Sequence, residues 1–295
     1  MKHLLFTGAA TALVTPFFKD GSIDFGKYKE LIDYQIESGI DCIVAVGTTG
    51  ENAVLSGDEH IKLMECAVSA AKGRVPVICS TGSNDTEYGR HTSIAAEEAG
   101  ADGLLLVTPY YNKCTQHGLI SHYERILSGT KLPAIIYNVP SRTGFDISVG
   151  TYKILSENPQ IAGVKEASGN VSKAVEIAAV CGDDLPIYSG NDDLIVPLMS
   201  IGAKGVISVL SNLLPGLTHD ICALCLADDY PAASRLALEY ADLTSALFSE
   251  VNPIPIKAAM EMVGLCSGRV RLPLTSLGEE HRKSLEELLK THGLI

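Results

Sequence analysis

The stretch 161-IAGVKEASG-169 begins as a buried strand and then places charge inside it. Residues 161–164 are apolar or small, Lys165 and Glu166 follow directly, and Ser168 and Gly169 start a turn. A lysine at such a place can extend its amine to the protein surface, which is the commoner case. It can also hold a desolvated amine ready to attack a carbonyl group. The rest of the chain has to decide between these two interpretations.

The composition argues against several functional classes. The chain has 295 residues, of which 46% are hydrophobic, and this is enough for a sizeable core in one large domain or two smaller ones. The formal net charge is -12, and without a basic cluster this argues against binding to nucleic acid. The N-terminal residues lack the layout of a signal peptide, and no apolar run is long enough to span a membrane. We therefore expect a soluble, cytoplasmic protein with no nucleic-acid or membrane partner.

The cysteines are scattered through apolar surroundings, which favours a reduced protein over a disulfide framework. Cys222 and Cys225 form a CxxC pair inside 219-HDICALCLAD-228, where the apolar residues have helical spacing. Neither a second cysteine pair nor a histidine pair accompanies them. We therefore expect buried helix residues here, with a metal or redox centre as the less favoured alternative.

Short apolar runs alternate along the chain with longer amphipathic runs. The short runs are nearly continuous in hydrophobicity, as expected for parallel strands that are buried on both faces. Eight strands are predicted, at residues 8–17, 42–47, 75–82, 103–109, 133–140, 161–168, 186–191 and 205–210.

The segments between these strands have the periodicity of amphipathic helices, as in 24–39, 56–73, 85–100 and 148–159. Ser56 is placed to cap the second of these helices, and Gly73 to end it. Successive strand–helix units indicate an α/β protein with a (β/α)8 TIM barrel. A doubly wound open sheet is the main alternative, but no GxGxxG sequence follows the first strand.

The chain beyond residue 210 shows only helical patterns, near 215–228, 231–249, 254–264 and 278–291. One of these helices closes the eighth unit, and the others form a C-terminal helical extension. We therefore divide the chain into a barrel that holds the catalytic site, residues 1–225, and an extension, residues 226–295.

In a (β/α)8 barrel, the active site lies at the C-terminal ends of the strands and in the loops that follow them. Lys165 is at such an end, where an inward-facing side chain can meet a bound ligand. The polar residues at the ends of the earlier strands are Thr48, Thr49, Glu51, Tyr110, Tyr111, Tyr137, Asn138, Arg142 and Lys165. The seventh strand ends in Ser189, Gly190 and Asn191.

Burial of Lys165 would disfavour its ammonium form, lower its pKa and free the amine at neutral pH. A free amine in a dry pocket attacks a ketone or aldehyde, and the protonated imine then makes the adjacent carbon acidic without a metal ion. An ion pair between Lys165 and Glu166 is the structural alternative. Adjacent residues of a strand point to opposite faces, however, so this pairing is disfavoured.

Three further motifs could complete such a site, although each also has an ordinary structural explanation. Tyr137 could shuttle protons beside the lysine, or it could be a core tyrosine bonded to backbone. The threonines of 47-GTTGE-51 could hold a small carboxylate, or the loop could be an ordinary tight turn. Arg142 could bind a second carboxylate through two hydrogen bonds, or it could lie on the surface.

Several motifs make the chain resemble the pyruvate-dependent class I aldolases, the family of dihydrodipicolinate synthase and N-acetylneuraminate lyase. They are GAATALVTPF, GTTGE, TPYYNK, YNVPSRTG, GVKEASGN, GVISV, NPIPIK and RLPL, in this order over nearly the whole chain. The combination of GTTGE, YNVPSRTG and GVKEASG is highly specific. Arg142 and Thr48 favour the dihydrodipicolinate synthases, because the sialic-acid lyases usually have GSTGE at the glycine loop and lack this arginine.

The resemblance implies roles for four catalytic residues. Lys165 would form a Schiff base with pyruvate, and Tyr137 would donate and accept protons at that centre. Thr48 and Tyr111 would complete a hydroxyl relay from Tyr137 toward solvent. In this family the tyrosine at the Tyr111 position enters the active site of the neighbouring subunit. The implied assembly is therefore a homotetramer built from two tight dimers.

The resemblance also implies how the substrates are bound. Thr49 would hold the carboxylate of pyruvate, and the main chain of Ile207 would border the same molecule. Arg142 would bind the carboxylate of the second substrate, L-aspartate 4-semialdehyde, and Gly190 would belong to the same substrate pocket. No metal or other cofactor is implied, because pyruvate is held covalently on Lys165.

The implied reaction condenses pyruvate with L-aspartate 4-semialdehyde to give 4-hydroxy-tetrahydrodipicolinate, the first committed step of diaminopimelate and lysine biosynthesis. The alternative is a related pyruvate-dependent aldolase with another aldehyde acceptor, such as a sialic acid or 2-keto-3-deoxy sugar acid lyase. A catalytically silent barrel that senses pyruvate-like acids is a third interpretation, but a binder needs no proton relay.

Many members of this family bind lysine as a feedback inhibitor in a cleft at the tight-dimer interface. The corresponding residues here would be Asn52, Ala53, His60, Asn84, Tyr88 and Tyr110. Tyr88 stands where lysine-sensitive members carry a glutamate that would pair with the amine of the effector. Glu87 is one residue away, which is about 100° around the helix. The resemblance therefore implies weakened or absent inhibition by lysine.

Overall fold

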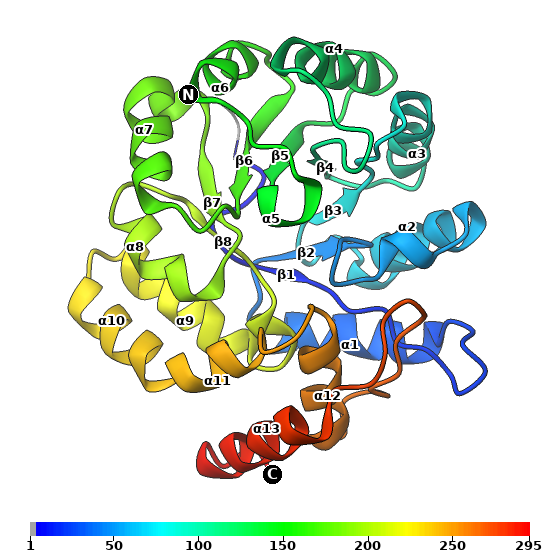
Figure 1. The fold of residues 1–295 in the computed structure, drawn as a ribbon, viewed down its shortest axis with the longest axis vertical. Helices are drawn as coiled ribbons and strands as arrows, with labels where there is room; N and C mark the ends of the chain where they lie inside the picture. The colour runs from blue at the N-terminus through cyan, green and yellow to red at the C-terminus, as the bar shows by residue number, and fades with distance from the viewer. Residues whose placement is uncertain (1–3) are drawn as a thin grey trace.

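The computed structural model describes residues 4–295, and within this range eight parallel strands close into a barrel. Each strand pairs with the next in chain order, and β8 pairs with β1. The strands are β1 (Gly8–Ala12), β2 (Cys42–Ala45), β3 (Val77–Ser80), β4 (Gly103–Val107), β5 (Ala134–Asn138), β6 (Ile161–Glu166), β7 (Ile187–Ser189) and β8 (Gly205–Ser208). Figure 1 shows them at the centre of the molecule, with helices around them. The predicted (β/α)8 barrel is confirmed, and the open sheet is wrong.

The helices that surround the barrel alternate with its strands. They are α1 (Phe25–Glu37), α2 (Gly57–Ala71), α3 (Thr86–Glu98), α4 (Gln116–Leu127), α5 (Pro140–Thr143), α6 (Val149–Ser156), α7 (Val171–Cys181), α8 (Ile195–Met199) and α9 (Pro215–Leu226), with 3-10 turns η1 (Asn52–Val54), η2 (Gly182–Asp184), η3 (Asp192–Leu194) and η4 (Leu210–Asn212). Ser56 caps α2 in a capping box with Glu59, as its sequence predicts. This helix ends at Ala71, and its C-cap is Lys72, one residue before the predicted Gly73.

The strands are shorter than the apolar runs that predict them. The run at 8–17 yields only β1, yet Leu13 and Val14 beyond its end are fully buried. The backbone N–H of Val14 donates to the side chain of Asn212 at 3.0 Å instead of continuing the sheet. Hydrophobicity reports burial, and burial continues past the point where strand pairing stops.

Two layers of apolar side chains hold the barrel together. One cluster fills the barrel interior and includes Ile135 and Tyr137, and the other lies between barrel and helices and includes Ala134 and Ile136. Successive residues of β5 therefore alternate between the two layers, as the pleat of a strand requires. This alternation decides which side chain of each strand can reach a site inside the barrel.

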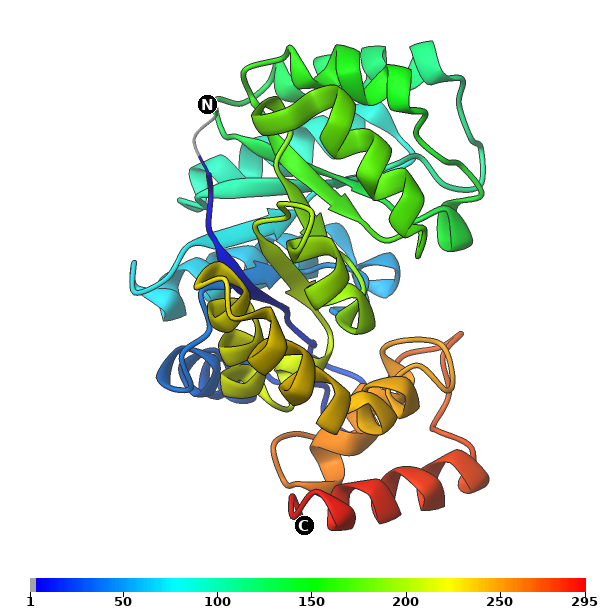
Figure 2. The ribbon, with the colours of Figure 1, turned by 90° about the vertical axis from the view of Figure 1, so that its left-hand side faces the viewer.

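The C-terminal extension consists of α10 (Tyr230–Glu239), α11 (Ala241–Ala246), α12 (Ile254–Met262) and α13 (Glu279–Thr291). Figure 2 shows α12 and α13 at one end of the molecule, below the barrel in that view. The single helix predicted over 231–249 is wrong, because the chain leaves helical geometry at Tyr240, with φ −109° and ψ 16°. The Tyr240 ring stacks on His292 with centroids 4.7 Å apart. The division at residue 225 falls within the last turn of α9 and stays a prediction.

Cys222 and Cys225 are buried on α9, so the prediction of buried helix residues is confirmed. Within residues 4–295, no cluster of three or more His, Cys, Asp or Glu side chains has the arrangement of a metal site. None of the helices in the same range is long and apolar enough to cross a membrane.

Candidate active site

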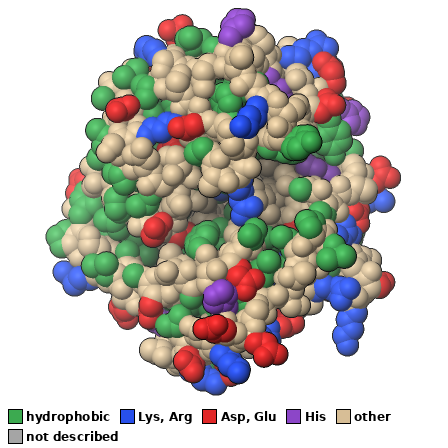
Figure 3. Space-filling view, viewed as in Figure 1, with side chains coloured by type: hydrophobic (Ala, Val, Ile, Leu, Met, Phe, Trp, Pro, Cys, Tyr) green, Lys and Arg blue, Asp and Glu red, His purple; other side chains and the backbone are tan. Residues whose placement is uncertain are grey.

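A polar cavity opens at the C-terminal ends of the barrel strands. Its volume is about 170 Å³, similar to engineered cavities of about 150 Å³ that hold benzene. Figure 3 shows the corresponding face of the molecule, which is hollowed near its centre. Six of the predicted site residues line the cavity: Thr48, Thr49, Tyr137, Arg142, Lys165 and Gly190. Strand ends therefore identified most of the site.

Lys165 points from β6 into the cavity and is only 6% exposed. Its Nζ lies 4.4 Å from the centroid of the Tyr137 ring, on the neighbouring strand. Burial lowers the pKa of the Lys165 amine to about 8; the nearby Asp192 carboxylate opposes this shift, and the positive charge of Arg142 adds to it. Glu166 lies on the opposite face of β6, bonded to Tyr152, so the ion-pair alternative for Lys165 is wrong.

Tyr137 is almost completely buried beside the lysine. The side chain of Thr48 is close enough to act on its hydroxyl as a hydrogen-bond partner. Burial raises the pKa of the Tyr137 phenol, while Arg142 and the hydrogen bond with Thr48 act in the opposite direction. A neutral phenol with a hydroxyl partner can both donate and accept a proton, which a tyrosine bonded only to backbone could not do as readily.

The carboxylate-binding candidates are linked to one another through Asn252 of the C-terminal extension. Asn252 donates from Nδ2 to Oγ1 of Thr49 at 3.0 Å, and its carbonyl accepts from Nη2 of Arg142, also at 3.0 Å. Asn252 and Phe248 both line the cavity. The sequence did not predict these two residues as part of the site, because along the chain they lie far from any predicted strand. The only signal was the NPIPIK motif, which begins at Asn252.

Glu51 does not line the cavity but anchors the loop that carries the two threonines. It has left-handed backbone geometry with φ 60°, and its Oε1 is 2.7 Å from Nζ of Lys257 on α12. Both side chains of this ion pair are fully buried. Oε2 of Glu51 accepts from the backbone N–H of Arg271 at 2.9 Å. The C-terminal extension thus holds the 47–51 loop in place through Lys257 and the backbone of Arg271.

Asp192 is a buried carboxylate near Lys165 that sequence reasoning also missed. Its Oδ2 accepts hydrogen bonds from the backbone N–H groups of Val209 and Leu210, both at 3.0 Å. Burial raises the pKa of Asp192, and these hydrogen bonds and the charge of Lys165 oppose that shift. Asp192 lies just beyond the end of β7 and directly follows Asn191, the last residue predicted for that strand end. Asn191 itself lines the cavity.

Gly190 faces the lysine at the end of β7. A Cβ atom there would lie 2.5 Å from Cβ of Ala167 and 3.1 Å from Cε of Lys165. A side chain at position 190 would therefore clash with Ala167 and press against the Lys165 side chain, which explains the glycine at this position.

Two predicted site residues lie apart from the cavity in the single chain. Tyr111 is 93% exposed and has positive φ, 67°. Ile207 is fully buried inside the barrel, where it pairs with Ala10, and it is not a lining residue, although Val209 two positions later is. The roles of Tyr111 and Ile207 remain predictions.

The residues of the predicted lysine cleft have the following surroundings. His60 is buried and its Nε2 contacts the carbonyl of Ser80 at 2.9 Å, while the Asn84 carbonyl accepts from Nδ2 of Asn112, also at 2.9 Å. Asn52 and Ala53 belong to η1. Tyr88 and Tyr110 are 40% and 37% exposed.

Glu87 does not take the place of the glutamate that the predicted lysine cleft lacks at position 88. Its carboxylate pairs with Nε of Arg125 at 2.7 Å, on the neighbouring helix α4. This pair agrees with the different helix direction expected of Glu87.

A closed parallel barrel whose cavity holds a desolvated lysine amine beside a tyrosine ring has the fold and the site of a Schiff-base-forming aldolase. The comparisons with known proteins make this class more specific. The chain belongs to the dihydrodipicolinate synthetase family, whose model matches residues 5–292.

Individual relatives cover almost the whole chain. A protein of Lachnoclostridium phytofermentans named 4-hydroxy-tetrahydrodipicolinate synthase is 49% identical over 292 residues, which are 99% of each chain. One of the same name from Caldicellulosiruptor saccharolyticus is 48% identical over 290 residues, 98% of each chain. The crystal structure of chloride-inhibited dihydrodipicolinate synthase from Acinetobacter baumannii complexed with pyruvate is 42% identical and superposes with a TM-score of 0.96, covering 98% of this chain and 99% of that one.

Proposed function

We propose that this protein catalyses the 4-hydroxy-tetrahydrodipicolinate synthase reaction, the condensation of pyruvate with L-aspartate 4-semialdehyde. The observation that carries the proposal is the buried amine of Lys165, whose pKa is lowered to about 8 inside a cavity large enough for a small ligand. The names of the full-length relatives supply the substrate pair.

The reaction begins when the free amine of Lys165 attacks the ketone carbon of pyruvate. The carbinolamine loses water to give a protonated imine, and this imine loses a proton from the pyruvate methyl group to give an enamine. The enamine carbon attacks the aldehyde carbon, whose oxygen takes up a proton. The amino group of the second substrate then displaces Lys165 and closes the six-membered ring.

Protons have to move at nearly every one of these steps, and the hydroxyl of Tyr137 is our candidate for carrying them. The Tyr137 ring lies beside the amine, and the side chain of Thr48 acts on its hydroxyl as a hydrogen-bond partner. Loss of a positioned acid–base group typically costs about 10²- to 10⁴-fold in rate. We propose that Thr48 passes the proton onward to Tyr111, which would reach the site from a neighbouring subunit.

Two groups suit the carboxylates of the substrates. Thr49 and the adjacent backbone of the 47–51 loop lie at the cavity wall, where pyruvate would bind. Arg142, on α5, lies at the rim and would bind the carboxylate of L-aspartate 4-semialdehyde through two hydrogen bonds. We infer that Gly190 and the Ile207 main chain border the same ligands. The chemistry resides in the lysine amine, so the proposal includes no metal or organic cofactor.

The test is a condensation assay with both substrates, coupled to dihydrodipicolinate reductase and followed by oxidation of the nicotinamide cofactor. We expect turnover by the natural chain and none by Lys165→Ala. An absence of turnover in folded protein that still forms a pyruvate adduct on Lys165 would point to the related aldolases with another aldehyde acceptor.

Arg142→Ala separates the two substrates in the same assay. Hydrogen bonds to a charged group are worth about 2 kcal/mol, or about 30-fold in an equilibrium constant. We therefore expect the KM for the aldehyde to rise by at least about this factor, while adduct formation with pyruvate continues. Unchanged aldehyde kinetics would contradict the role of Arg142.

The assembly and its regulation follow from the same proposal. We propose a homotetramer of tight dimers in which Tyr111 is shared across the dimer interface, and a cytoplasmic site of action for this biosynthetic step. We also propose that lysine inhibits weakly or not at all, because Tyr88 cannot pair with the effector amine and Glu87 is engaged with Arg125. Half-inhibition by lysine below a millimolar concentration would contradict this.

A further inference from the structure

Strands β5 and β6 present reactive side chains on one face and a buried polar contact on the other. Their register aligns Tyr137 with Lys165 and Asn138 with Glu166. Because successive strand residues alternate in direction, the first pair faces the cavity and the second pair faces the surrounding helices. We call Asn138 and Glu166 the outer pair. Each of them directly follows one of the two reactive residues in the chain.

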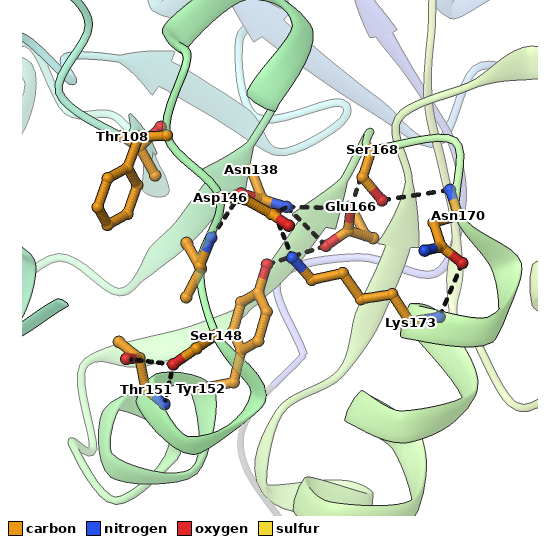
Figure 4. A network of polar contacts seen from close by, with 12 residues as sticks. Thr108, Asn138, Asp146, Ser148, Thr151, Tyr152, Glu166, Ser168, Asn170 and Lys173 are labelled. Atoms are coloured by element: carbon orange, nitrogen blue, oxygen red, sulfur yellow. Dashed lines mark hydrogen bonds and ion pairs between the residues drawn. The ribbon is translucent and has the colours of Figure 1, made fainter. Parts of the chain in front are cut away.

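Glu166 is only 3% exposed, and both oxygens of its carboxylate accept hydrogen bonds. Nδ2 of Asn138 donates to its two oxygens at 3.2 and 3.1 Å, and the Tyr152 hydroxyl on α6 donates at 2.9 Å. The backbone N–H of Ser168 donates at 2.8 Å. Figure 4 shows these groups converging on Glu166 from β5, α6 and the turn after β6.

Asn138 is fully buried and is fixed from a second direction as well. Its Nδ2 also lies 2.9 Å from Oδ1 of Asp146, which in turn pairs with Lys173, and its Oδ1 accepts from the backbone N–H of Ile147 at 3.2 Å. Figure 4 shows Lys173 reaching this cluster from α7. The outer pair thus ties β5 and β6 to two helices.

The packing of barrel against helices does not by itself require polar residues at positions 138 and 166. The preceding outward-facing residues are Ile136 on β5 and Val164 on β6, and both belong to the apolar layer between barrel and helices. Burying a carboxylate is costly unless it is fully hydrogen-bonded, whereas an apolar pair would continue the same layer. The change from apolar to polar occurs at the two positions that adjoin Tyr137 and Lys165.

We propose that Asn138 and Glu166 are positioning residues that set the separation and orientation of Tyr137 and Lys165 through the strand backbone. The inference rests on the proposed Schiff-base function, in which Tyr137 exchanges protons with groups on Lys165. The outer pair also fixes the neighbouring backbone, since the Asn138 carbonyl accepts from Ala167 N–H at 2.9 Å and the Glu166 carbonyl from Gly190 N–H at 2.8 Å. Proton transfer and addition to the ketone depend on such sub-ångström placement.

The first test variant is Glu166→Gln, which keeps the size of the side chain. It replaces one acceptor oxygen by an NH₂ group that faces the donors from Asn138 and Tyr152. We expect kcat to fall by about tenfold to a hundredfold, the range associated with small misplacements of reacting groups. The rate of pyruvate adduct formation, trapped by borohydride, should fall with it, while the KM for each substrate changes much less.

Tyr152→Phe is the matched control. It removes a donor to the same carboxylate from the helix side and leaves the contact between Asn138 and Glu166 across the strands intact. We expect this variant to lose thermal stability but to retain kcat. If both variants lose kcat only in proportion to their unfolded fraction, the network is purely structural and the inference is overturned.

Asn138→Ser is the second variant, in case Glu166→Gln does not fold. It keeps the carboxylate with its donors from Tyr152 and Ser168. It removes the link between the strands, together with the contacts of the Asn138 side chain to Asp146 and Ile147. A fall in kcat at nearly constant KM supports the inference, and full activity of a folded Asn138→Ser protein overturns it. If the natural chain forms no pyruvate adduct, the proposed function itself fails. This outcome differs from failure of the inference about Asn138 and Glu166, which requires an active natural chain and equally active folded variants.

Discussion

At the scale of the residue, Lys165 is surrounded by groups with opposing effects on its charge. Burial favours the neutral amine, the guanidinium of Arg142 favours it further, and the carboxylate of Asp192 favours the ammonium. Burial has the largest effect, so the pKa of Lys165 lies at about 8 instead of its usual 10.5. A substantial fraction of the amine is therefore neutral just above physiological pH. This neutral form is the one that attacks a ketone.

This balance predicts the pH dependence of imine formation. The rate at which pyruvate becomes attached to Lys165 should rise with pH, because only the neutral amine reacts, and its midpoint should lie at about 8. Mass spectrometry after borohydride quenching at each pH measures this rate. Asp192→Asn removes a charge that favours the ammonium, so it should move the midpoint to lower pH. A midpoint near 10.5 would show that the amine is not desolvated.

Some of these residues could be predicted from sequence and others could not. Strand alternation alone predicts that Lys165 and Glu166 face opposite sides of β6, and the structure places Lys165 inside. Asp192, Phe248 and Asn252 could not be found in this way. Phe248 and Asn252 line the cavity from the C-terminal extension, and Asp192 acts on Lys165 from a 3-10 turn. Only the closed tertiary structure brings these segments to the strand ends.

At the scale of the element, the extension acts as a support for the 47–51 loop. The ion pair of Lys257 on α12 with Glu51 is fully buried, and Nζ of Lys257 also donates to the carbonyl of Thr15 at 2.8 Å. Lys257 further lies over the Phe17 ring, 4.3 Å from its centroid, and Arg271 lies 4.5 Å from the same centroid. One buried aromatic ring in contact with two cations thus joins the loop after β1 to the last segments of the chain.

Lys257→Met should be strongly destabilising, because it leaves the Glu51 carboxylate buried without its partner. Breaking such a pair on one side typically costs about 3–5 kcal/mol of unfolding free energy. Urea denaturation measures this loss. Lys290→Met breaks the exposed pair with Glu286 and should cost less than about 1 kcal/mol. Equal effects of the two substitutions would show that the buried pair does not support the loop.

Element boundaries show the limit of sequence patterns at this scale. Apolar runs located every strand but extended past the strand ends, as after Ala12, since buried loops are as apolar as buried strands. Helical periodicity continued across Tyr240, where the chain breaks into α10 and α11 and the ring stacks on His292. A contact between residues far apart in sequence leaves no local periodic signal.

At the scale of the whole molecule, the proposed site is assembled from distant parts. The barrel contributes the lysine and the tyrosine, and the extension contributes Phe248 and Asn252. The proposed relay also needs Tyr111, whose side chain is 93% exposed in the single chain and lies outside the cavity. A neighbouring subunit would complete the relay by placing its own tyrosine in the cavity.

Mixing of two inactive variants tests this shared site. Lys165→Ala lacks the nucleophile and Tyr111→Phe lacks the last hydroxyl of the relay, so each alone should have low activity. In a mixed dimer, one cavity would combine an intact Lys165 with an intact Tyr111 from the other chain. Activity should therefore recover when the two are dissociated and reassembled together. If activity does not recover although mixed dimers form, Tyr111 acts within its own chain or not at all.

The central claim is that the lysine at the end of β6 is the nucleophile of the reaction. The most direct measurement is incubation with pyruvate, reduction with borohydride, and mass spectrometry of the proteolytic peptides. We expect one reduced pyruvate on the peptide that contains Lys165, and none on the Lys165→Ala protein or when borohydride is added without pyruvate. An adduct on another lysine, or no adduct on a folded protein, would contradict the account.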